Sequence, residues 1–549
     1  MTSLLLLTAA MAAFANEIEH TPGFAIRGLA DDNIGSNVHS AGDVDGDGID
    51  DIIADGYRSS TQSMVAVVYS GANRRVLHEV EHAAFSVLPT YSVDGVGDLD
   101  GDGHGEFIVG FPERESAVVY SGADGSVRFT LQGRPGPAAF GGTVAGGGDA
   151  DGDGVPDVIV GTDRRGSVNR PGYVRVYSGA TGDLLHNFEG RRPTVGFGGA
   201  IADAGDCNGD GYADIVIGSE SDGTDFLFVP PITGFGPLRQ VDRSGAVYVY
   251  SGADGTLLHR LLGADEDERL GFTVAGAGDV DGDGRDDVIA GTEFPEFPRF
   301  GVATVFSGAT GQVLHTFLGQ EAAEGVSVDG VGDLDLDGFD DLLVGSRLSN
   351  FGEPAVKVYS GATGEVLFAA ADIPGFDNYH SVSRAGDLNG DGVGDFLVGV
   401  TLELSFPGVI FTYVSKPGPG LAYCVSTPNS TGGAAAMVTT GSASLVANDL
   451  RLAARPVPNT LGRFIYGAAQ AQTPIGGGFL CVGGQSAFLP PTVAVGNTLS
   501  QPLDATMPPD PALTITAGST WNFQAWFLDP NGGGAGRNLS DGLEVTFVP

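Results

Sequence analysis

A nine-residue acidic phrase, DVDGDGIDD at residues 43–51, holds the side chains best suited to chemistry in this chain. Aspartates stand at its first, third, fifth and ninth positions, and the seventh residue can offer a backbone carbonyl. Glycine at the sixth position permits a sharp turn with positive φ, so these oxygens can converge on one point. Ca²⁺ takes about six to eight oxygen ligands, whereas Zn²⁺ prefers nitrogen and sulfur and Mg²⁺ demands a tighter octahedron. The phrase therefore predicts a calcium-binding loop, with a solvated acidic turn as the alternative.

The phrase occurs seven times, beginning at residues 43, 98, 149, 206, 279, 333 and 387, and the copies are 51 to 73 residues apart. Repetition of the whole arrangement favours cation binding over a turn that is merely acidic. Each copy is expected to bind through positions one, three, five, seven and nine, and position seven would use its carbonyl. The predicted ligands are Asp43, Asp45, Asp47, Ile49, Asp51, Asp98, Asp100, Asp102, His104, Glu106, Asp149, Asp151, Asp153, Val155, Asp157, Asp206, Asn208, Asp210, Tyr212, Asp214, Asp279, Asp281, Asp283, Arg285, Asp287, Asp333, Asp335, Asp337, Phe339, Asp341, Asp387, Asn389, Asp391, Val393 and Asp395.

The copies are not identical, and none is an EF-hand. An EF-hand needs a glutamate at position twelve and flanking helices, but the twelfth residue is apolar in every copy. Glu106 replaces aspartate at position nine of the second loop and has a longer reach. Asn208 and Asn389 lower the charge of loops four and seven, and Leu336 replaces glycine at position four of loop six. We expect these last three loops to bind cations more weakly.

Acidic residues are concentrated in these phrases. The chain of 549 residues has 69 acidic and 27 basic residues, a net charge of −42, and 29 of the acids lie in the seven phrases. Without cations the loops should repel and loosen, and bound cations should stabilise the fold by mass action. We expect up to seven Ca²⁺ ions, bound in the range of about 10⁻⁴–10⁻³ M. The charge excludes nucleic acid as a partner, because phosphate binding needs a basic face.

Short runs rich in Val, Ile, Tyr and Phe surround each phrase and are separated by Gly, Asp and Ser. In the third unit, FGGTVAGG precedes the phrase, and VIVGT, YVRVYSG and LLHNFEG follow it. Such runs are typical of strands and too short for helices. Four strands per unit of about 54 residues predict an all-β chain with a seven-bladed β-propeller. The last unit offers three strands, so Glu17–Arg27 is expected to supply its outer strand and close the ring.

Composition divides the chain into three parts. Residues 1–15 are apolar and end in an A-x-A site, which predicts a signal peptide although a positive n-region is missing; a buried strand is the alternative. Residues 16–416 are expected to form the propeller. Residues 417–549 contain TWNFQAWFLDP and LEVTFVP, which predict a small β-sandwich-like domain after the linker-like KPGPG at 416–420. No other apolar run reaches the roughly 20 residues that span a bilayer.

Cysteine and histidine usage indicates structural rather than catalytic roles. Cys424 and Cys481 are candidates for a disulfide, and Cys207 is expected to be a buried or loop thiol. Four histidines occupy the same place in four units, which predicts a structural role for His78, His186, His259 and His315. No G-x-S-x-G or Cys–His arrangement is present, so we expect no enzymatic activity.

Loops between the second and third strands would lie on the face opposite the acidic phrases. The fourth unit expands this loop to SESDGTDFLFVPPITGFGPLRQ, and the third contains TDRRGSVNRP. Aromatic and arginine side chains suit recognition of a protein or glycan, whereas the alternative is that the aromatic rings pack back onto the blades. The candidates on this ligand face are Phe226, Phe228, Phe235, Arg164 and Arg165.

Together these features resemble the FG-GAP repeat propeller of integrin α-subunit heads. The resemblance is carried by Phe140-Gly141, Phe197-Gly198, the Gly-Asp before each loop and the D-x-D-G-D-G-x-x-D phrases, and it covers roughly residues 17–416. It implies calcium at one face and ligand contacts at the other. No D-x-S-x-S motif is present, so binding through an integrin-type inserted domain is not expected. Similar propellers also accompany some secreted bacterial enzymes and lectins, so the fold alone does not decide the function.

The sequence thus predicts a secreted or cell-surface calcium-binding propeller. We expect it to act as a monomer that binds an extracellular protein or glycan, as in adhesion, with no membrane span. Two alternatives remain at this point: a carbohydrate-active enzyme with its site among the ligand-face loops, and a purely structural surface protein.

Overall fold

The computed structural model describes residues 20–548 apart from short internal segments. These segments are 29–31, 84–91, 136–137, 163–170, 192–195, 223–243, 266–267, 293–300, 320–322, 348–355, 371–379, 390–392, 402–407, 416–420, 425, 432, 476–477, 508, 512 and 531–535. The predicted signal peptide at 1–15 and the linker at 416–420 therefore lie outside the described residues. In the part described, no helix is long and apolar enough to cross a membrane.

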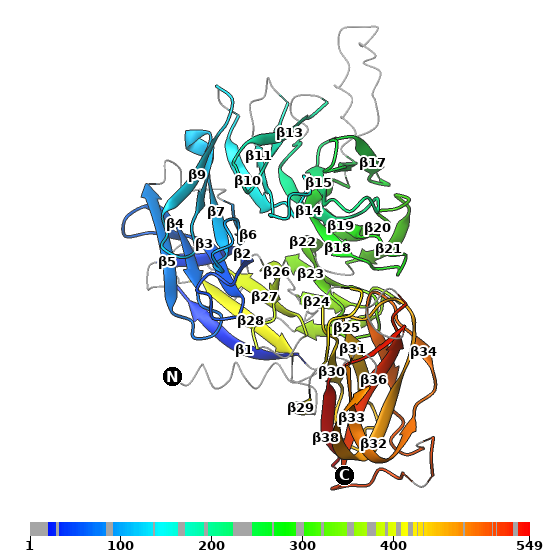
Figure 1. Ribbon diagram of the computed structural model, residues 1–549. Coiled ribbons are helices and arrows are strands. Elements are labelled where there is room, and N and C mark those ends of the chain that lie inside the picture. Colours follow the sequence, from blue (N-terminus) through cyan, green and yellow to red (C-terminus); the bar gives the residue numbers. More distant parts are fainter. Residues whose placement is uncertain are drawn as a thin grey trace.

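The described residues before 416 form seven four-stranded antiparallel sheets (Figure 1). The first three sheets contain β2 Asp32–Gly42, β3 Asp51–Arg58, β4 Ser63–Tyr69 and β5 Val76–Ala83; β6 Val93–Gly97, β7 Glu106–Phe111, β8 Ser116–Tyr120 and β9 Val127–Gln132; and β10 Phe140–Gly146, β11 Val158–Thr162, β12 Tyr173–Tyr177 and β13 Leu184–Glu189. The next two contain β14 Ala200–Gly205, β15 Asp214–Ser219, β16 Ala246–Tyr250 and β17 Leu257–Leu262; and β18 Leu270–Gly278, β19 Asp287–Thr292, β20 Val302–Phe306 and β21 Val313–Leu318. The last two contain β22 Ala323–Gly332, β23 Asp341–Arg347, β24 Val356–Tyr359 and β25 Val366–Ala370; and β26 His380–Gly386, β27 Asp395–Val400, β28 Val409–Ser415 and β1 His20–Arg27.

These sheets are the blades of a β-propeller. The first strands of successive sheets contact one another around the ring, from β2 through β6, β10, β14, β18 and β22 to β26, and β26 contacts β2 again. Each acidic phrase joins the first strand of its blade to the second. The second strands, such as β7 and β15, are buried along their whole length, which explains their unbroken apolar sequences. The outer strands are more exposed: β13 has one buried residue, Phe188, among exposed and half-buried ones.

The N-terminal strand closes the ring, as the sequence predicts. Strand β1 pairs antiparallel with β28, with Ala25 opposite Phe411 and Arg27 opposite Val409. The pairing confirms that His20–Arg27 forms the expected outer strand of the last blade. The first three residues of the predicted segment, 17–19, lie outside the described range. The one helical segment described is a 3₁₀ turn, Pro112–Arg114, which the strand-only expectation missed.

Beyond residue 420 the chain forms two further sheets (Figure 1). One has seven strands and the other three, and they enclose a shared apolar core that includes Phe464, Phe523 and Phe527. Cys424 and Cys481 form a disulfide, which confirms their predicted pairing, and Cys207 is a buried free thiol. The strands are β29 Leu421–Tyr423, β30 Ala436–Thr440, β31 Arg451–Arg455, β32 Leu461–Ile475, β33 Gly478–Phe488, β34 Thr492–Val493, β35 Leu499–Pro502, β36 Thr520–Leu528, β37 Arg537–Leu539 and β38 Gly542–Thr546.

Candidate metal centres

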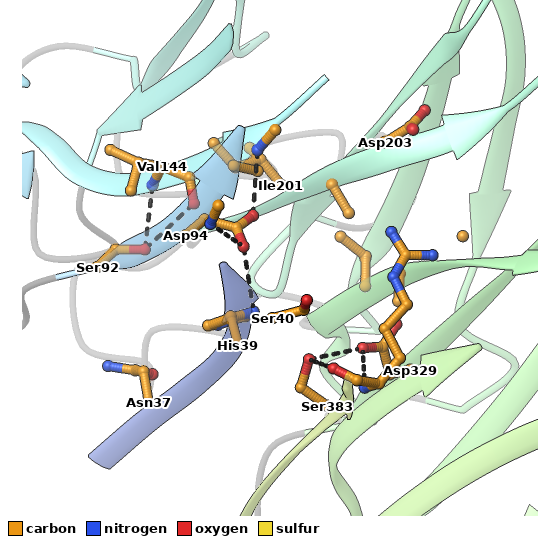
Figure 2. Close-up of a pocket in the computed structure, with 18 of the residues that line it drawn as sticks. Asn37, His39, Ser40, Ser92, Asp94, Val144, Ile201, Asp203, Asp329 and Ser383 are labelled. Atoms are coloured by element: carbon orange, nitrogen blue, oxygen red, sulfur yellow. Dashed lines mark hydrogen bonds and ion pairs between the residues drawn. The ribbon is translucent and has the colours of Figure 1, made fainter. Parts of the chain in front are cut away.

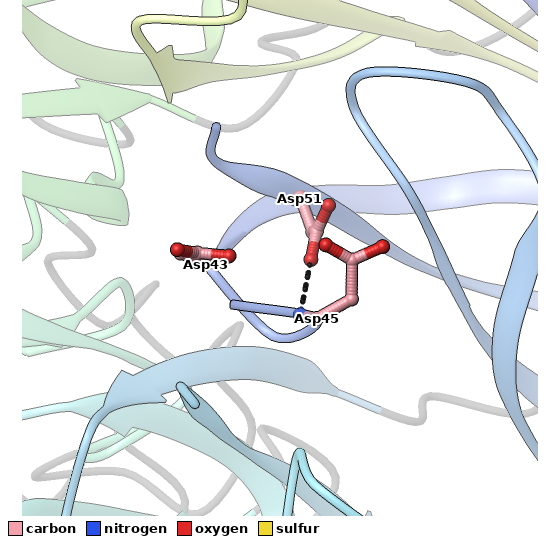
Figure 3. A group of neighbouring side chains, drawn as sticks. All are labelled: Asp43, Asp45 and Asp51. Atoms are coloured by element: carbon pink, nitrogen blue, oxygen red, sulfur yellow. Dashed lines mark hydrogen bonds between the residues drawn. The ribbon is translucent and has the colours of Figure 1, made fainter. Parts of the chain in front are cut away.

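The first acidic loop brings three carboxylates together (Figure 3). One oxygen from each of Asp43, Asp45 and Asp51 lies within 4.8 Å of the other two. Asp43 and Asp45 come from the loop itself, whereas Asp51 is the first residue of β3 and is fully buried. Positions one, three and nine of the phrase therefore meet at one point, which is the arrangement that an oxygen-binding cation needs.

The same three positions meet in four more loops. In each of them one oxygen per side chain lies within 4.8 Å of the others. These groups are Asp98, Asp100 and Glu106; Asp149, Asp151 and Asp157; Asp279, Asp281 and Asp287; and Asp333, Asp335 and Asp341. Glu106 takes the place of the usual aspartate without breaking the group, as its longer side chain predicts.

Backbone amides hold the loop in this shape. The N–H groups of Asp47 and Gly48 donate to the two oxygens of Asp43, at 3.0 and 2.8 Å. Asp47, at position five, instead accepts a hydrogen bond from the Ile49 N–H at 3.0 Å. The corresponding bond to position five recurs in five other loops, at Asp102, Asp153, Asp210, Asp283 and Asp337. The fifth aspartate thus stabilises the turn, and its predicted role as a ligand stays a prediction.

Position nine connects each loop to the rest of its blade. Asp51 accepts hydrogen bonds from the N–H of Val44 at 2.8 Å and from the N–H of Gly71 at 2.9 Å. Gly71 belongs to the Ser-Gly turn between β4 and β5, and a Cβ there would lie only 2.0 Å from the Asp50 carbonyl oxygen. This close approach explains why a Ser-Gly pair follows the third strand in the blades. Burial raises the pKa of Asp51 and Asp157 to about 6 and that of Asp214 and Asp287 to about 7.

Three of the five groups contain a buried carboxylate oxygen that lacks a hydrogen-bond partner. They are Asp45 Oδ1, Glu106 Oε1 and Asp279 Oδ1. Buried polar atoms are nearly always paired, and an unpaired carboxylate oxygen is costly. The other oxygen of Asp45, Oδ2, forms an ion pair with Arg75 Nη2 at 2.9 Å, so Oδ1 is the oxygen of this carboxylate left without a partner. The donor set therefore fits a hard cation such as Ca²⁺.

Loops four and seven differ from the other five in the described residues. In loop four the Asn208 Nδ2 donates to Asp214 Oδ1 at 3.2 Å, so an amide stands where the other loops have an acid. In loop seven the Asn389 Nδ2 donates to the Ser415 carbonyl at 2.7 Å, and Asp391 lies outside the described residues. Weaker cation binding at both loops stays a prediction.

Loop six lies under the C-terminal domain. Leu336 has a φ of +58°, is fully buried and shares an apolar cluster with Val393 of the last blade and Ala453 of β31. A Cβ at Gly338 would lie 2.7 Å from the Val495 carbonyl oxygen. Leu336, which replaces the glycine found in the other loops, thus packs at the interface between the propeller and the C-terminal domain. Burial, followed by the neighbouring Asp337 and Asp335, raises the pKa of Asp333 to about 7.

The four repeated histidines link neighbouring blades. His78 Nε2 lies 2.6 Å from the carbonyl oxygen of Gly122, which belongs to the Ser-Gly turn of the next blade. His259 and His315 make the same contact to Gly308 and Gly361, both at 2.6 Å. His186 contacts Gly252 in the same way. The prediction of a structural role is confirmed for these side chains.

The central channel is a second candidate site, a cavity of about 450 Å³ lined by all seven innermost strands (Figure 2). Its polar side chains join adjacent blades. Ser92 accepts from the Val144 N–H at 3.1 Å, and Asp94 accepts from the Gly146 N–H at 3.1 Å. Asp329 accepts from the hydroxyl of Ser383 at 3.0 Å, in the last blade. These contacts make Asp94 and Asp329 links between neighbouring blades.

Phe226, Phe228, Phe235, Arg164 and Arg165 all lie outside the described residues. The sequence reasoning missed Arg75 and Arg128, which form ion pairs with the third-position aspartates Asp45 and Asp100. One arginine precedes and the other follows the first valine of its outer strand, so no fixed spacing could have identified them.

Comparisons with known proteins agree with this architecture. The FG-GAP-like repeat family matches residues 98–160, which span the second and third acidic loops. Integrin alpha-5 of Xenopus laevis is 34% identical over 234 residues, which cover 40% of this chain and 20% of that protein. Integrin alpha-V of Gallus gallus is 31% identical over 227 residues, or 39% and 21% of the two chains. Integrin alpha-PS2 of Drosophila melanogaster is 30% identical over 183 residues, or 28% and 12%.

The aligned region spans about a fifth of the integrin alpha-5 and alpha-V chains. In this chain, four-stranded sheets surround a ring, and an acidic loop lies between the first two strands of each sheet. Residues 98–160 thus match the FG-GAP-like repeat family, and about 40% of the chain is similar to integrin α subunits.

Proposed function

We propose that this chain is a secreted or cell-surface ligand-binding module whose propeller is stabilised by Ca²⁺ at up to seven acidic loops. One observation carries the cation part of this proposal: carboxylates at positions one, three and nine converge in five loops, and in three of them a buried oxygen lacks a hydrogen-bond partner. A bound cation would supply the positive charge that these oxygens need.

The loop residues would act together on such a cation. Positions one, three and nine would provide charged oxygens, and the fifth aspartate and the seventh carbonyl are the predicted further ligands. Their chemistry is entirely that of oxygen, and the groups contain no histidine or cysteine, which favours Ca²⁺ over Zn²⁺. The role of the cation would be to hold the loop face in one shape, so that the opposite face is presented to a partner without distortion.

We propose an extracellular protein or glycan as that partner. Support comes from the similarity to integrin α subunits and from the aromatic and basic residues of the expanded loops, Phe226, Phe228, Phe235, Arg164 and Arg165. The repeated histidines and the channel residues Asp94 and Asp329 are engaged in contacts between blades, which favours a binding role over a catalytic one.

Replacing Phe226 and Phe228 with serine is expected to lower binding at least about tenfold, because the two rings would be the apolar anchors of the contact. Binding would be measured in Ca²⁺ on a glycan array and on purified extracellular matrix proteins. V127S/V313S is the matched control, since Val127 and Val313 are exposed apolar residues of outer strands, and it should bind like the unchanged chain. Equal binding by F226S/F228S and by the control would refute the proposed ligand face.

A further inference from the structure

Neighbouring acidic loops are joined to one another, and the joints are not the same all round the ring. We propose that loops one and two bind cations cooperatively, whereas loops two and three bind them independently. The inference rests on the cation binding proposed above and adds a property of its own: the order and coupling in which the sites fill.

The joint between loops one and two has two polar contacts and one packing contact. The Gly105 N–H, at position eight of loop two, donates to the Asp43 carbonyl oxygen at 2.7 Å. His104, at position seven, places its Nδ1 2.8 Å from the Val44 carbonyl oxygen. A Cβ at Gly46 would lie 2.9 Å from His104 Cε1, so the imidazole covers the fourth position of loop one. Loop two thus holds the backbone of the residues that begin loop one.

The same joint recurs further along the ring. In three more loops the N–H of the residue at position eight donates to the carbonyl oxygen of the first residue of the preceding loop. The Ala213 N–H donates to Asp149 at 3.0 Å, the Asp286 N–H to Asp206 at 3.2 Å and the Asp340 N–H to Asp279 at 3.1 Å. Where position eight is an aspartate, its carboxylate also accepts the N–H of that first residue: Asp286 from Asp206 at 2.7 Å, and Asp340 from Asp279 at 2.9 Å. Tyr212, Arg285 and Phe339 cover the fourth-position glycines of the loops before them.

The joint between loops two and three lacks these contacts. Position eight of loop three is Pro156, which has no N–H to donate and no carboxylate to accept. A Cβ at Gly101, at position four of loop two, would meet nothing within 4 Å, so Val155 does not cover it. Apolar contact remains, because Val155 of loop three packs against the cluster that contains Leu99 of loop two. Apolar packing is therefore kept at this joint, and the hydrogen-bonded link between the two loops is what is missing.

A cation in loop two would order positions seven to nine of that loop, since position nine is a ligand and position seven is predicted to be one. Because His104 and Gly105 bind the backbone of Val44 and Asp43, this ordering also fixes the first ligand of loop one. The entropic cost of forming site one is then lower when site two is filled. Coupling of this kind is reciprocal, so filling loop one must favour loop two to the same extent. At position eight of loop three, Pro156 offers no N–H for the corresponding hydrogen bond to loop two.

Cation binding at loop two can distinguish the two kinds of joint, because loop two is hydrogen-bonded to loop one and lacks the corresponding bond to loop three. We would follow hydrogen–deuterium exchange of residues 98–106 in the full chain by mass spectrometry as free Ca²⁺ is raised. D51N disables loop one and D157N disables loop three, and the two carboxylates are matched: both are fully buried and both accept from position two and from a Ser-Gly turn. D51N should raise the Ca²⁺ concentration for half protection of loop two about fivefold or more, and D157N less than about twofold.

Two further variant sets make the result decisive. H104V/G105P copies the Val-Pro of loop three into loop two, and in that background D51N should no longer shift loop two. D45N and D151N, at position three, repeat the comparison with milder substitutions if the position-nine variants lose their fold. Equal shifts from loops one and three, or a larger shift from loop three, would overturn the inference while leaving cation binding intact. Absence of Ca²⁺-dependent protection in every loop would instead overturn the proposed function, and the inference with it.

Discussion

Removal of Ca²⁺ from the full chain is expected to lower its melting temperature by about 10 °C or more. Five loops bring three acids within 4.8 Å of one another, and in the absence of a cation their charges repel. A ligand at about a hundredfold excess over its dissociation constant stabilises the folded state by about 2.7 kcal/mol per site. Several sites together therefore contribute on the order of 10 kcal/mol, which is comparable with the whole stability of a typical domain.

The measurement is thermal unfolding by circular dichroism in about 10 mM Ca²⁺ and in excess chelator, with Ca²⁺ added back to the chelated sample. The same experiment on E106Q, which weakens one group, should give a smaller difference between the two conditions. A melting temperature that is the same with and without Ca²⁺ would show that the loops do not need a cation to fold.

The pH dependence of stability is expected to reverse when Ca²⁺ is added. In the cation-free chain, burial raises the pKa of Asp51 and Asp157 to about 6 and that of Asp214 and Asp287 to about 7, against 3.8 for an exposed aspartate. The folded state then binds more protons than the unfolded state between about pH 4 and pH 7, so stability falls as pH rises through this window. A displacement from 3.8 to about 6 corresponds to about 3 kcal/mol per group.

With Ca²⁺ present the sign changes, because the cation must displace the proton from each carboxylate. The stabilisation by Ca²⁺ should be complete near pH 7.5 and fall to less than about half at pH 5. Melting temperatures across this range, with Ca²⁺ and with chelator, measure both slopes. Parallel pH profiles in the two conditions would show that the buried carboxylates and the cation do not share a site.

Much of this architecture could be predicted from the sequence because the information is local. Carboxylates at positions one, three and nine converge through the geometry of one loop, and the runs of Val and Ile that follow are buried strands. The closing strand His20–Arg27 was predictable because the last unit has one strand too few. The structural role of His78 followed from the recurrence of histidine at the same place in four units. The disulfide followed from the presence of Cys424 and Cys481 in the same C-terminal region.

The features that escaped prediction depend on contacts between distant residues. From the sequence, Leu336 predicts a loop that binds cations more weakly. Only the position of the C-terminal domain shows that Leu336 belongs to an apolar cluster with Ala453. Position eight looks unimportant within a single phrase, yet Asp286 and Asp340 bind the backbone of the preceding loop. The hydrogen bond of Asp47 to the turn depends on the local backbone shape, which the spacing of carboxylates does not reveal.

The central claim is that these carboxylates bind divalent cations, and the number of bound ions tests it most directly. The full chain would be dialysed to equilibrium against Ca²⁺ of known free concentration, and calcium per chain measured by mass spectrometry of the elements. We predict about five or more Ca²⁺ per chain, in line with the five convergent groups, and one fewer in D157N. A chain that retains no Ca²⁺ above the dialysis buffer, or a D157N variant that retains as much as the unchanged chain, would contradict the account.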